Sequence, residues 1–137
     1  MQGSKEMHSN QEFGYQLPRM VVEPPGPKSR AIAEKLATYE TPNMSYIKDG
    51  SIPIIWEEGR GANIVDVDGN LYIDLTAGFC VAGAGHSNPR IADAVAQQAH
   101  KLLHSQGGAN PNPVRAALAE KVAQLAPGDL SMTYIGS

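Results

Sequence analysis

Three aspartates accompany a glycine in the segment IVDVDGNLYID, residues 64–74, and carboxylates at such spacing could bind calcium. An EF-hand loop takes oxygen ligands at positions 1, 3 and 5, glycine at position 6 and glutamate at position 12. With Gly69 at position 6, Asp66 and Asp68 fit positions 3 and 5, but an isoleucine and a leucine stand at positions 1 and 12. Asp68-Gly69 is instead typical of a β-hairpin turn. A calcium module on these aspartates is the weaker alternative.

The glycine-rich segment GAGHSNP, residues 83–89, could begin a dinucleotide-binding turn. Gly83 and Gly85 fit the first two positions of the pattern G-x-G-x-x-G, but Asn88 occupies the third. No acidic residue ends a following strand about 20 residues further on, where such sites bind the ribose. We therefore expect a tight loop that leads into a helix.

His100 and His104 lie four residues apart, so on a helix they would share one face and could bind a metal ion. The segment HKLLH lacks the glutamate of a metalloprotease helix, and no third ligand is evident. Both histidines fall near the expected end of a helix, where a protonated imidazole interacts favourably with the helix dipole. A structural or interface role is therefore favoured over a metal site.

The residue types of covalent catalysis are present without their usual partners. None of the lysines stands in an apolar pattern that would activate it as a nucleophile. Cys80, the single cysteine, has no histidine partner in sequence, and we expect it to be a small buried residue of a tight loop. The residues by themselves define no catalytic nucleophile and no acid–base pair.

Periodicity predicts the elements that would position these residues. Residues 51–78 are rich in β-branched side chains and glycines, which predicts two or three short antiparallel strands. Residues 131–135, SMTYI, are expected to form a further strand. Asparagine-proline pairs precede two of the expected helices and would cap them. Helices are expected over residues 27–40, 89–104 and 113–126.

The composition is that of a globular protein: among 137 residues 42% are apolar and 18% are charged, with a net charge of −3. No basic block with interleaved aromatics is present, which argues against a nucleic-acid partner. The longest charge-free run, LTAGFCVAGAG, is shorter than the ~20 residues of a membrane helix. The N-terminus lacks the apolar core of a secretory signal. We expect a cytoplasmic protein.

Four motifs in a fixed order carry a family resemblance: PGPKSRAIAEK, WEEGRGANIVDVDGNLYIDLTAG, GHSNPRIADAVAQQAHKLLH and LAEKVAQLAPG. Over residues 21–137 the chain resembles the N-terminal part of class III aminotransferases, and the 4-aminobutyrate aminotransferase branch in particular. The resemblance implies an α/β chain that forms the N-terminal part of a fold type I pyridoxal-phosphate-dependent transferase. A small antiparallel hairpin segment would precede the first helices and strand of the large domain, and the chain is expected to be a truncated fragment.

The resemblance also implies an activity. Such enzymes are homodimers that use pyridoxal 5'-phosphate to move an amino group from an amino acid or an omega-amine to a 2-oxo acid. The family's Schiff-base lysine would lie beyond the C-terminus, so no catalytic residue is expected here and the chain alone would be inactive. The residue after Ala-Gly lines the family's substrate pocket, which assigns Phe79 to substrate binding, with a core phenylalanine as the alternative. Gly136 and Ser137 are expected to bind the cofactor phosphate.

The resemblance suggests three parts: a flexible tail over residues 1–20, the helix and strands of the small domain over residues 21–84, and the start of the cofactor domain over residues 85–137. A different class of function stays open beside the enzyme. The chain would then be a non-catalytic fragment or interaction module that retains the family's dimerisation surface, because a truncated chain exposes apolar faces.

Overall fold

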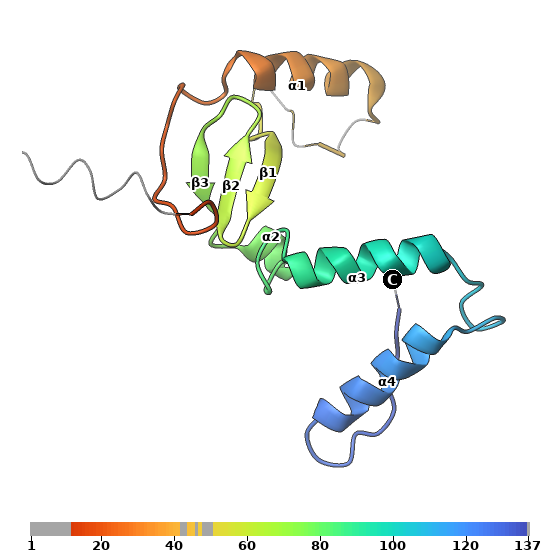
Figure 1. The fold of residues 1–137 in the computed structure, drawn as a ribbon. Helices are drawn as coiled ribbons and strands as arrows, with labels where there is room; N and C mark the ends of the chain where they lie inside the picture. Colours follow the sequence, from red (N-terminus) through yellow and green to blue (C-terminus); the bar gives the residue numbers. More distant parts are fainter. Residues whose placement is uncertain (1–11, 42–43, 46, 48–50, 137) are drawn as a thin grey trace, which may run out of the picture. The chain divides into compact units, whose positions relative to one another are not determined.

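The computed structural model describes residues 12–41, 44–45, 47 and 51–136, and Figure 1 shows their fold. The chain divides into two compact units between Ala92 and Asp93. The first unit contains a helix and a small sheet, and the second contains most of one helix and all of another. Each unit is described by itself below.

The sheet of the first unit has three antiparallel strands in the order β1-β2-β3. The strands are β1 (Trp56–Arg60), β2 (Asn63–Asp66) and β3 (Leu71–Ile73), which confirms the expectation of short antiparallel strands. Gly61 connects β1 to β2 with a φ of +56°, and a Cβ atom there would lie 2.7 Å from the carbonyl oxygen of Gly14. Glycine is therefore required at this turn.

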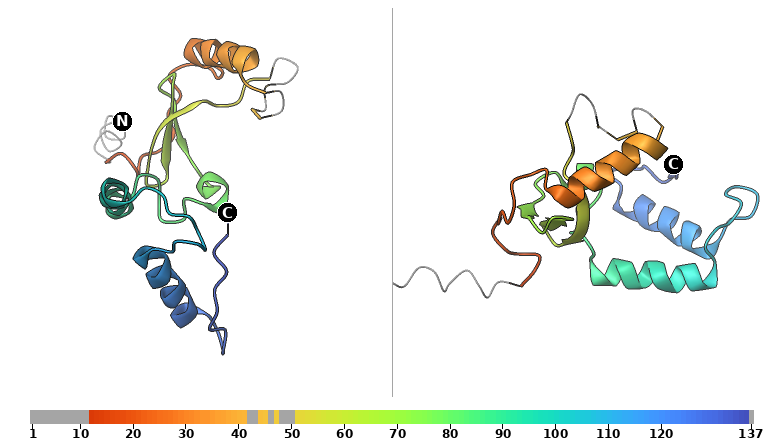
Figure 2. Two further views of the ribbon diagram at one scale, coloured as in Figure 1. Left: turned by 90° about the vertical axis from the view of Figure 1, so that its right-hand side faces the viewer. Right: turned by 90° about the horizontal axis from the view of Figure 1, so that it is seen from above.

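Helix α1 (Pro27–Tyr39) lies across the end of the sheet where β2 turns into β3, as the views in Figures 1 and 2 agree. Gly26 precedes the helix and offers no side-chain cap. The carboxylate of Asp68 supplies the cap from the hairpin turn, since it accepts hydrogen bonds from the backbone N–H groups of Lys28 and Ser29 at 2.8 and 3.0 Å. These are the donors that a helix start leaves unpaired.

Buried amides fix the segment that precedes α1. The side-chain oxygen of Asn63 accepts hydrogen bonds from the backbone N–H groups of Gly14 and Gln16, and that of Asn70 accepts from Val21 and Val22. The flexible tail expected for residues 1–20 includes Gly14 and Gln16, whose backbone N–H groups bind the side chain of Asn63. The part of that expectation that concerns residues 1–11 lies outside the described residues.

The buried interior of the first unit is small and largely polar. Its buried apolar side chains are Ala33, Ile64 and Leu71. Four polar residues are buried beside them, and their side-chain atoms have hydrogen-bond partners in the described part of the chain. Buried polar groups need such partners, since an unpaired one costs roughly 1–3 kcal/mol. The four are Ser29, Asn63, Asp66 and Asn70.

Two helices follow, α3 (Pro89–Lys101), which begins before the unit boundary, and α4 (Pro113–Leu125). Both start after the predicted asparagine: Asn112 accepts a hydrogen bond from the backbone N–H of Arg115 at 2.9 Å, and Asn88 accepts one from that of Arg90 at 3.1 Å. Neither helix contains a buried residue. Within the described residues no helix is long and apolar enough to cross a membrane.

The prediction of a strand at residues 131–135 is wrong: the structure shows no strand in this segment. Its β-branched and aromatic residues favour extended backbone, but a strand exists only when a neighbouring strand pairs with it. The sheet that the structure describes consists of β1, β2 and β3 alone.

Candidate functional site

The aspartates of the hairpin turn are structural. Asp66, 1% exposed, accepts hydrogen bonds from the backbone N–H groups of Asp68 and Asn70, the side-chain amide of Asn70 and the hydroxyl of Tyr72. Burial raises the pKa of the Asp66 carboxyl, but the hydrogen bonds, those from Asn70 first, outweigh it and lower the pKa below its ordinary value. The carboxylates that suggested calcium are thus engaged by the turn and by the start of α1.

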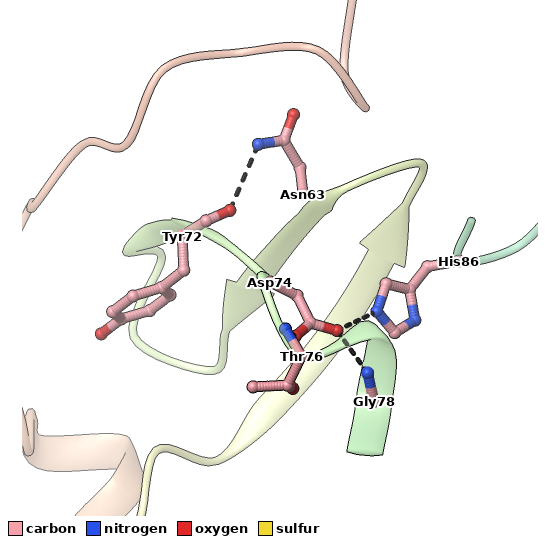
Figure 3. Close-up of polar contacts among 6 residues, drawn as sticks. All are labelled: Asn63, Tyr72, Asp74, Thr76, Gly78 and His86. Carbon is pink, nitrogen blue, oxygen red and sulfur yellow. Dashed lines mark hydrogen bonds and ion pairs between the residues drawn. The ribbon is translucent and has the colours of Figure 1, made fainter. Parts of the chain in front are cut away.

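A different carboxylate, Asp74, organises the segment after β3 (Figure 3). Its Oδ1 accepts hydrogen bonds from the backbone N–H and the hydroxyl of Thr76 at 2.9 and 2.6 Å. Its Oδ2 contacts the backbone N–H of Gly78 at 2.6 Å and Nε2 of His86 at 2.7 Å. The side chain of Asp74 is only 4% exposed. The Thr76 hydroxyl and His86 hold the pKa of the Asp74 carboxyl well below its usual range.

His86 is held on two sides. Because Asp74 is ionised and can only accept, Nε2 of His86 donates the proton of their hydrogen bond. The backbone of His86 forms a two-way bridge with Gly61, with N–H···O distances of 2.8 and 2.9 Å. The ring meets that of Trp56 edge to face, with centroids 5.7 Å apart. The imidazole is therefore a fixed part of the fold and ties Asp74 to the end of β1.

The segment held by Asp74 is a left-handed turn, α2 (Ala77–Cys80). Ala77, Gly78, Phe79 and Cys80 have φ values of 50°, 57°, 61° and 66°. Backbone hydrogen bonds close it, from Cys80 to Thr76 at 2.8 Å and from Val81 to Ala77 at 2.9 Å. Left-handed backbone costs non-glycine residues roughly 1–2 kcal/mol each, and such strain is often found at functional sites.

Phe79, the predicted substrate residue, occupies this turn and is 91% exposed. It is therefore not a core residue of this chain, which was the alternative interpretation. Cys80 beside it is exposed, so the expectation of a buried cysteine is wrong.

The predicted cofactor residues lie elsewhere in the chain. Gly136 belongs to the second unit and Phe79 to the first. A Cβ atom on Gly136 would lie 2.6 Å from Cε1 of Tyr134, but Tyr134 is 95% exposed and its ring could move aside. Ser137 lies outside the described residues. The missing Cβ is compatible with a turn whose backbone N–H groups approach a phosphate closely.

The histidine pair of α3 is split by the end of the helix. His100 stands in the last turn, while α3 ends at Lys101 and His104 follows it. In the part of the chain that the structure describes, no three histidine, cysteine, aspartate or glutamate side chains come together as a metal site would need.

A pocket of about 390 Å³ lies in the second unit, between the end of α3 and the start of α4. Leu102, Leu118 and Arg115 are among its lining residues. Phe79 and Gly136 do not line it, whereas the candidate histidine His104 does. Asn112 at its wall caps α4 and donates a hydrogen bond to the hydroxyl of Ser105 at 3.0 Å.

The chain belongs to the class-III aminotransferase family, whose pattern it matches over residues 45–137. It is 31% identical over 121 residues to an alanine/serine racemase of Pyrococcus horikoshii, covering 88% of this chain and 25% of the racemase. It is 33% identical over 110 residues to a 4-aminobutyrate aminotransferase of Mycobacterium bovis, covering 80% of this chain and 24% of that enzyme.

A solved structure with a similar fold is that of a transaminase from the marine bacterium Virgibacillus, with a TM-score of 0.66 and 28% identity over 75% of this chain and 24% of that one. The chain thus spans about a quarter of the length of the relatives it matches. The fold is accordingly that of an N-terminal part of a pyridoxal-phosphate-dependent transaminase, as the motifs predict.

Sequence reasoning missed Asp74 and His86, which lie 12 positions apart. Asp74 was noticed only as a member of an aspartate-rich segment, and His86 only as a letter within a glycine run. A histidine among small residues next to an Asn-Pro helix start is a weak signal, and pairing it with an aspartate requires the bridge between Gly61 and His86.

Proposed function

We propose that the natural-length protein is an aminotransferase that moves an amino group from an amino acid or omega-amine, of the 4-aminobutyrate kind, to a 2-oxo acid. The family match over residues 45–137 carries this proposal. The resemblance to a 4-aminobutyrate aminotransferase supports the choice of donor. The whole protein would be a cytoplasmic homodimer, as the resemblance implies.

Pyridoxal 5'-phosphate is the cofactor that this family uses, and when bound it supplies the electron sink for the reaction. Gly136 and Ser137 would hold its phosphate through backbone N–H groups. Glycine and serine are small residues, so they suit a turn whose backbone approaches the phosphate closely. Phosphate binding by such turns relies on backbone donors and needs no cationic side chain.

Phe79 would border the amino donor. Its ring is 91% exposed in this chain and stands on a turn whose backbone is fixed by Asp74. A rigid aromatic ring presents a large apolar surface at small entropic cost, so it can select donors by shape. The 137-residue chain alone would transfer no amino group, because none of its lysines matches the position of the family's Schiff-base lysine.

The test uses the natural-length protein with added pyridoxal phosphate, 4-aminobutyrate and 2-oxoglutarate, and measures the glutamate formed. A second assay follows the optical activity of a single alanine enantiomer, since one relative is a racemase. Glutamate formation supports the proposal. Inversion of alanine without amino transfer to any 2-oxo acid would overturn it in favour of a racemase.

The role of Phe79 is tested by Phe79→Ala. We expect kcat/KM for 4-aminobutyrate relative to a bulky aromatic amine to change about tenfold, as for loss of a shape-selective apolar contact. Leu75→Ala is the matched control, because Leu75 is equally exposed at 91% but precedes the turn. Equal changes in both variants would remove Phe79 from the substrate site.

The interaction module is the second candidate, and the exposed apolar residues of α3 and α4 favour it. Val95 is 62% exposed and Leu125 is 72% exposed. Under this candidate the 137-residue chain would bind a natural-length copy without transferring amino groups. Analytical ultracentrifugation of the labelled chain with that copy tests it, and independent sedimentation of the two would rule it out.

A further inference from the structure

The residues of α2 do not by themselves stabilise its left-handed backbone. Local sequence offers one glycine, Gly78, among four residues with positive φ, so three side-chain-bearing residues adopt a backbone that their chirality disfavours. Something outside the turn must compensate for this strain, since such residues persist only where the surroundings determine their conformation.

The compensation comes from Asp74. Its carboxylate binds the backbone N–H groups of Thr76 and Gly78, one before the turn and one inside it. These charge-assisted hydrogen bonds, at 2.9 and 2.6 Å, are stronger than neutral ones. Figure 3 shows the carboxylate between Gly78 and His86.

His86 in turn fixes Asp74. Its ring is 17% exposed, donates to Oδ2 at 2.7 Å, and is immobilised by the backbone bridge to Gly61 and by the edge-to-face contact with Trp56. Because this hydrogen-bond donor is itself anchored to the sheet, it fixes the carboxylate relative to the sheet, and the carboxylate fixes the turn.

We infer that the Asp74–His86 pair determines donor specificity at a distance: it holds the turn left-handed and thereby fixes the direction of the Phe79 ring toward the amino donor. The inference rests on the proposed function. His86 is a positioning residue in this scheme, because it acts on the donor only through Asp74 and Phe79. The discriminated ligands are primary amines that differ in bulk next to the amino-bearing carbon.

The experiment combines His86→Ala and Phe79→Ala in a double-mutant cycle in the natural-length protein. The readout is the ratio of kcat/KM for 4-aminobutyrate to that for a bulky aromatic amine, with KM and kcat resolved separately. We expect each single variant to shift the ratio about tenfold, mainly through KM, and the double variant to add nothing further, because both remove the same directed ring.

Two variants separate positioning from general damage. His86→Gln keeps a side-chain N–H for Asp74 and should restore much of the ratio, whereas His86→Ala should not. Thr76→Val removes only the hydroxyl donor of Asp74, is milder toward folding, and should shift the ratio in the same direction by a smaller factor. His100→Ala, a change of an exposed histidine, is the control and should leave the ratio unchanged.

Amide hydrogen exchange supplies a readout independent of turnover. The N–H of Gly78 should exchange at least about tenfold faster in His86→Ala than in wild type or His86→Gln.

The outcomes are distinct. Suppose that the wild type is active. If His86→Ala then lowers kcat/KM for all donors by the same factor, or if its effect adds to that of Phe79→Ala, the inference is overturned and the proposed function stands. A wild type that transfers no amino group from any donor overturns the proposed function and the specificity role together.

Discussion

The two units of this chain are stabilised by opposite means. In the first unit the largest fully buried side chains are polar. Asn63 and Asn70 bind backbone groups from segments distant in sequence, and Asp66 binds the backbone of its own hairpin turn. In the second unit the helices contain no buried residue, and their apolar side chains are exposed. The first unit is therefore specified by directed hydrogen bonds, whereas the described contacts that define α3 and α4 are local caps.

This contrast shows that the first unit fixes the positions of its residues with greater precision. Hydrogen bonds to buried carboxylates and amides fix direction as well as distance, while apolar contact is non-directional. The turn that presents Phe79 follows β3 and is bound to Asp74, so it inherits the rigid geometry of the sheet.

The largest effect that we expect is from Asp66→Ala. This change leaves the two N–H donors of Asn70, that of Asp68 and the hydroxyl of Tyr72 without their acceptor. The free energy of unfolding should fall by roughly 3–4 kcal/mol, measured by urea denaturation of the natural-length protein.

Asp93→Ala is the control for this change, since Asp93 is an exposed aspartate of α3 at the start of the second unit. It should alter the free energy of unfolding by less than about 0.5 kcal/mol. Equal losses in the two variants would break the contrast between the units.

The next effect is a loss of stability in acid. The folded-state pKa values of Asp66, Asp68 and Asp74 are lowered, so their contributions are fully present above the unfolded-state pKa of about 3.9 and are lost as the pH falls through the folded values. Hydrogen exchange measured as the pH falls below about 4 should therefore show opening first at the amides that these carboxylates bind.

Asp66→Asn sharpens the acid prediction, because it keeps the shape of the side chain and removes its titration. The slope of unfolding free energy against pH below about pH 4 should become shallower. An unchanged slope would mean that the hairpin carboxylates do not carry the acid sensitivity.

The smallest predicted effect is an increase in stability, from Ala77→Gly. Ala77 has a φ of +50°, and glycine adopts this backbone without a Cβ clash. Ala77→Gly should raise the free energy of unfolding by roughly 0.5–1 kcal/mol after the entropic cost of glycine. The same substitution at Ala119, in the middle of α4, should instead destabilise by about 1 kcal/mol. A loss at both positions would argue against a left-handed turn.

Local patterns predicted the elements whose causes are local. The helices at Pro27, Pro89 and Pro113 begin where a proline follows a glycine or an asparagine, and the hairpin turn lies at Asp68-Gly69. The strand predicted at residues 131–135 is absent, because a strand depends on a partner strand that its own residues do not specify.

Part of the candidate site was also within reach of the sequence. Phe79 followed from motif order, which marks a position in a family without giving its geometry. The roles of the aspartates did not follow: the spacing that suggested calcium serves a turn at Asp66 and a helix cap at Asp68. A cap supplied from 39 or 40 positions away leaves no periodic trace.

The sequence by itself determined the family, the helix starts and the hairpin, because these depend on neighbouring residues and on motif order. Only the tertiary structure decided that Asp74 meets His86 and that Ala77–Cys80 turn left-handed. The physical reason is that the backbone pairing of Gly61 with His86 places Nε2 of His86 2.7 Å from Oδ2 of Asp74. This contact fixes the carboxylate that binds the turn.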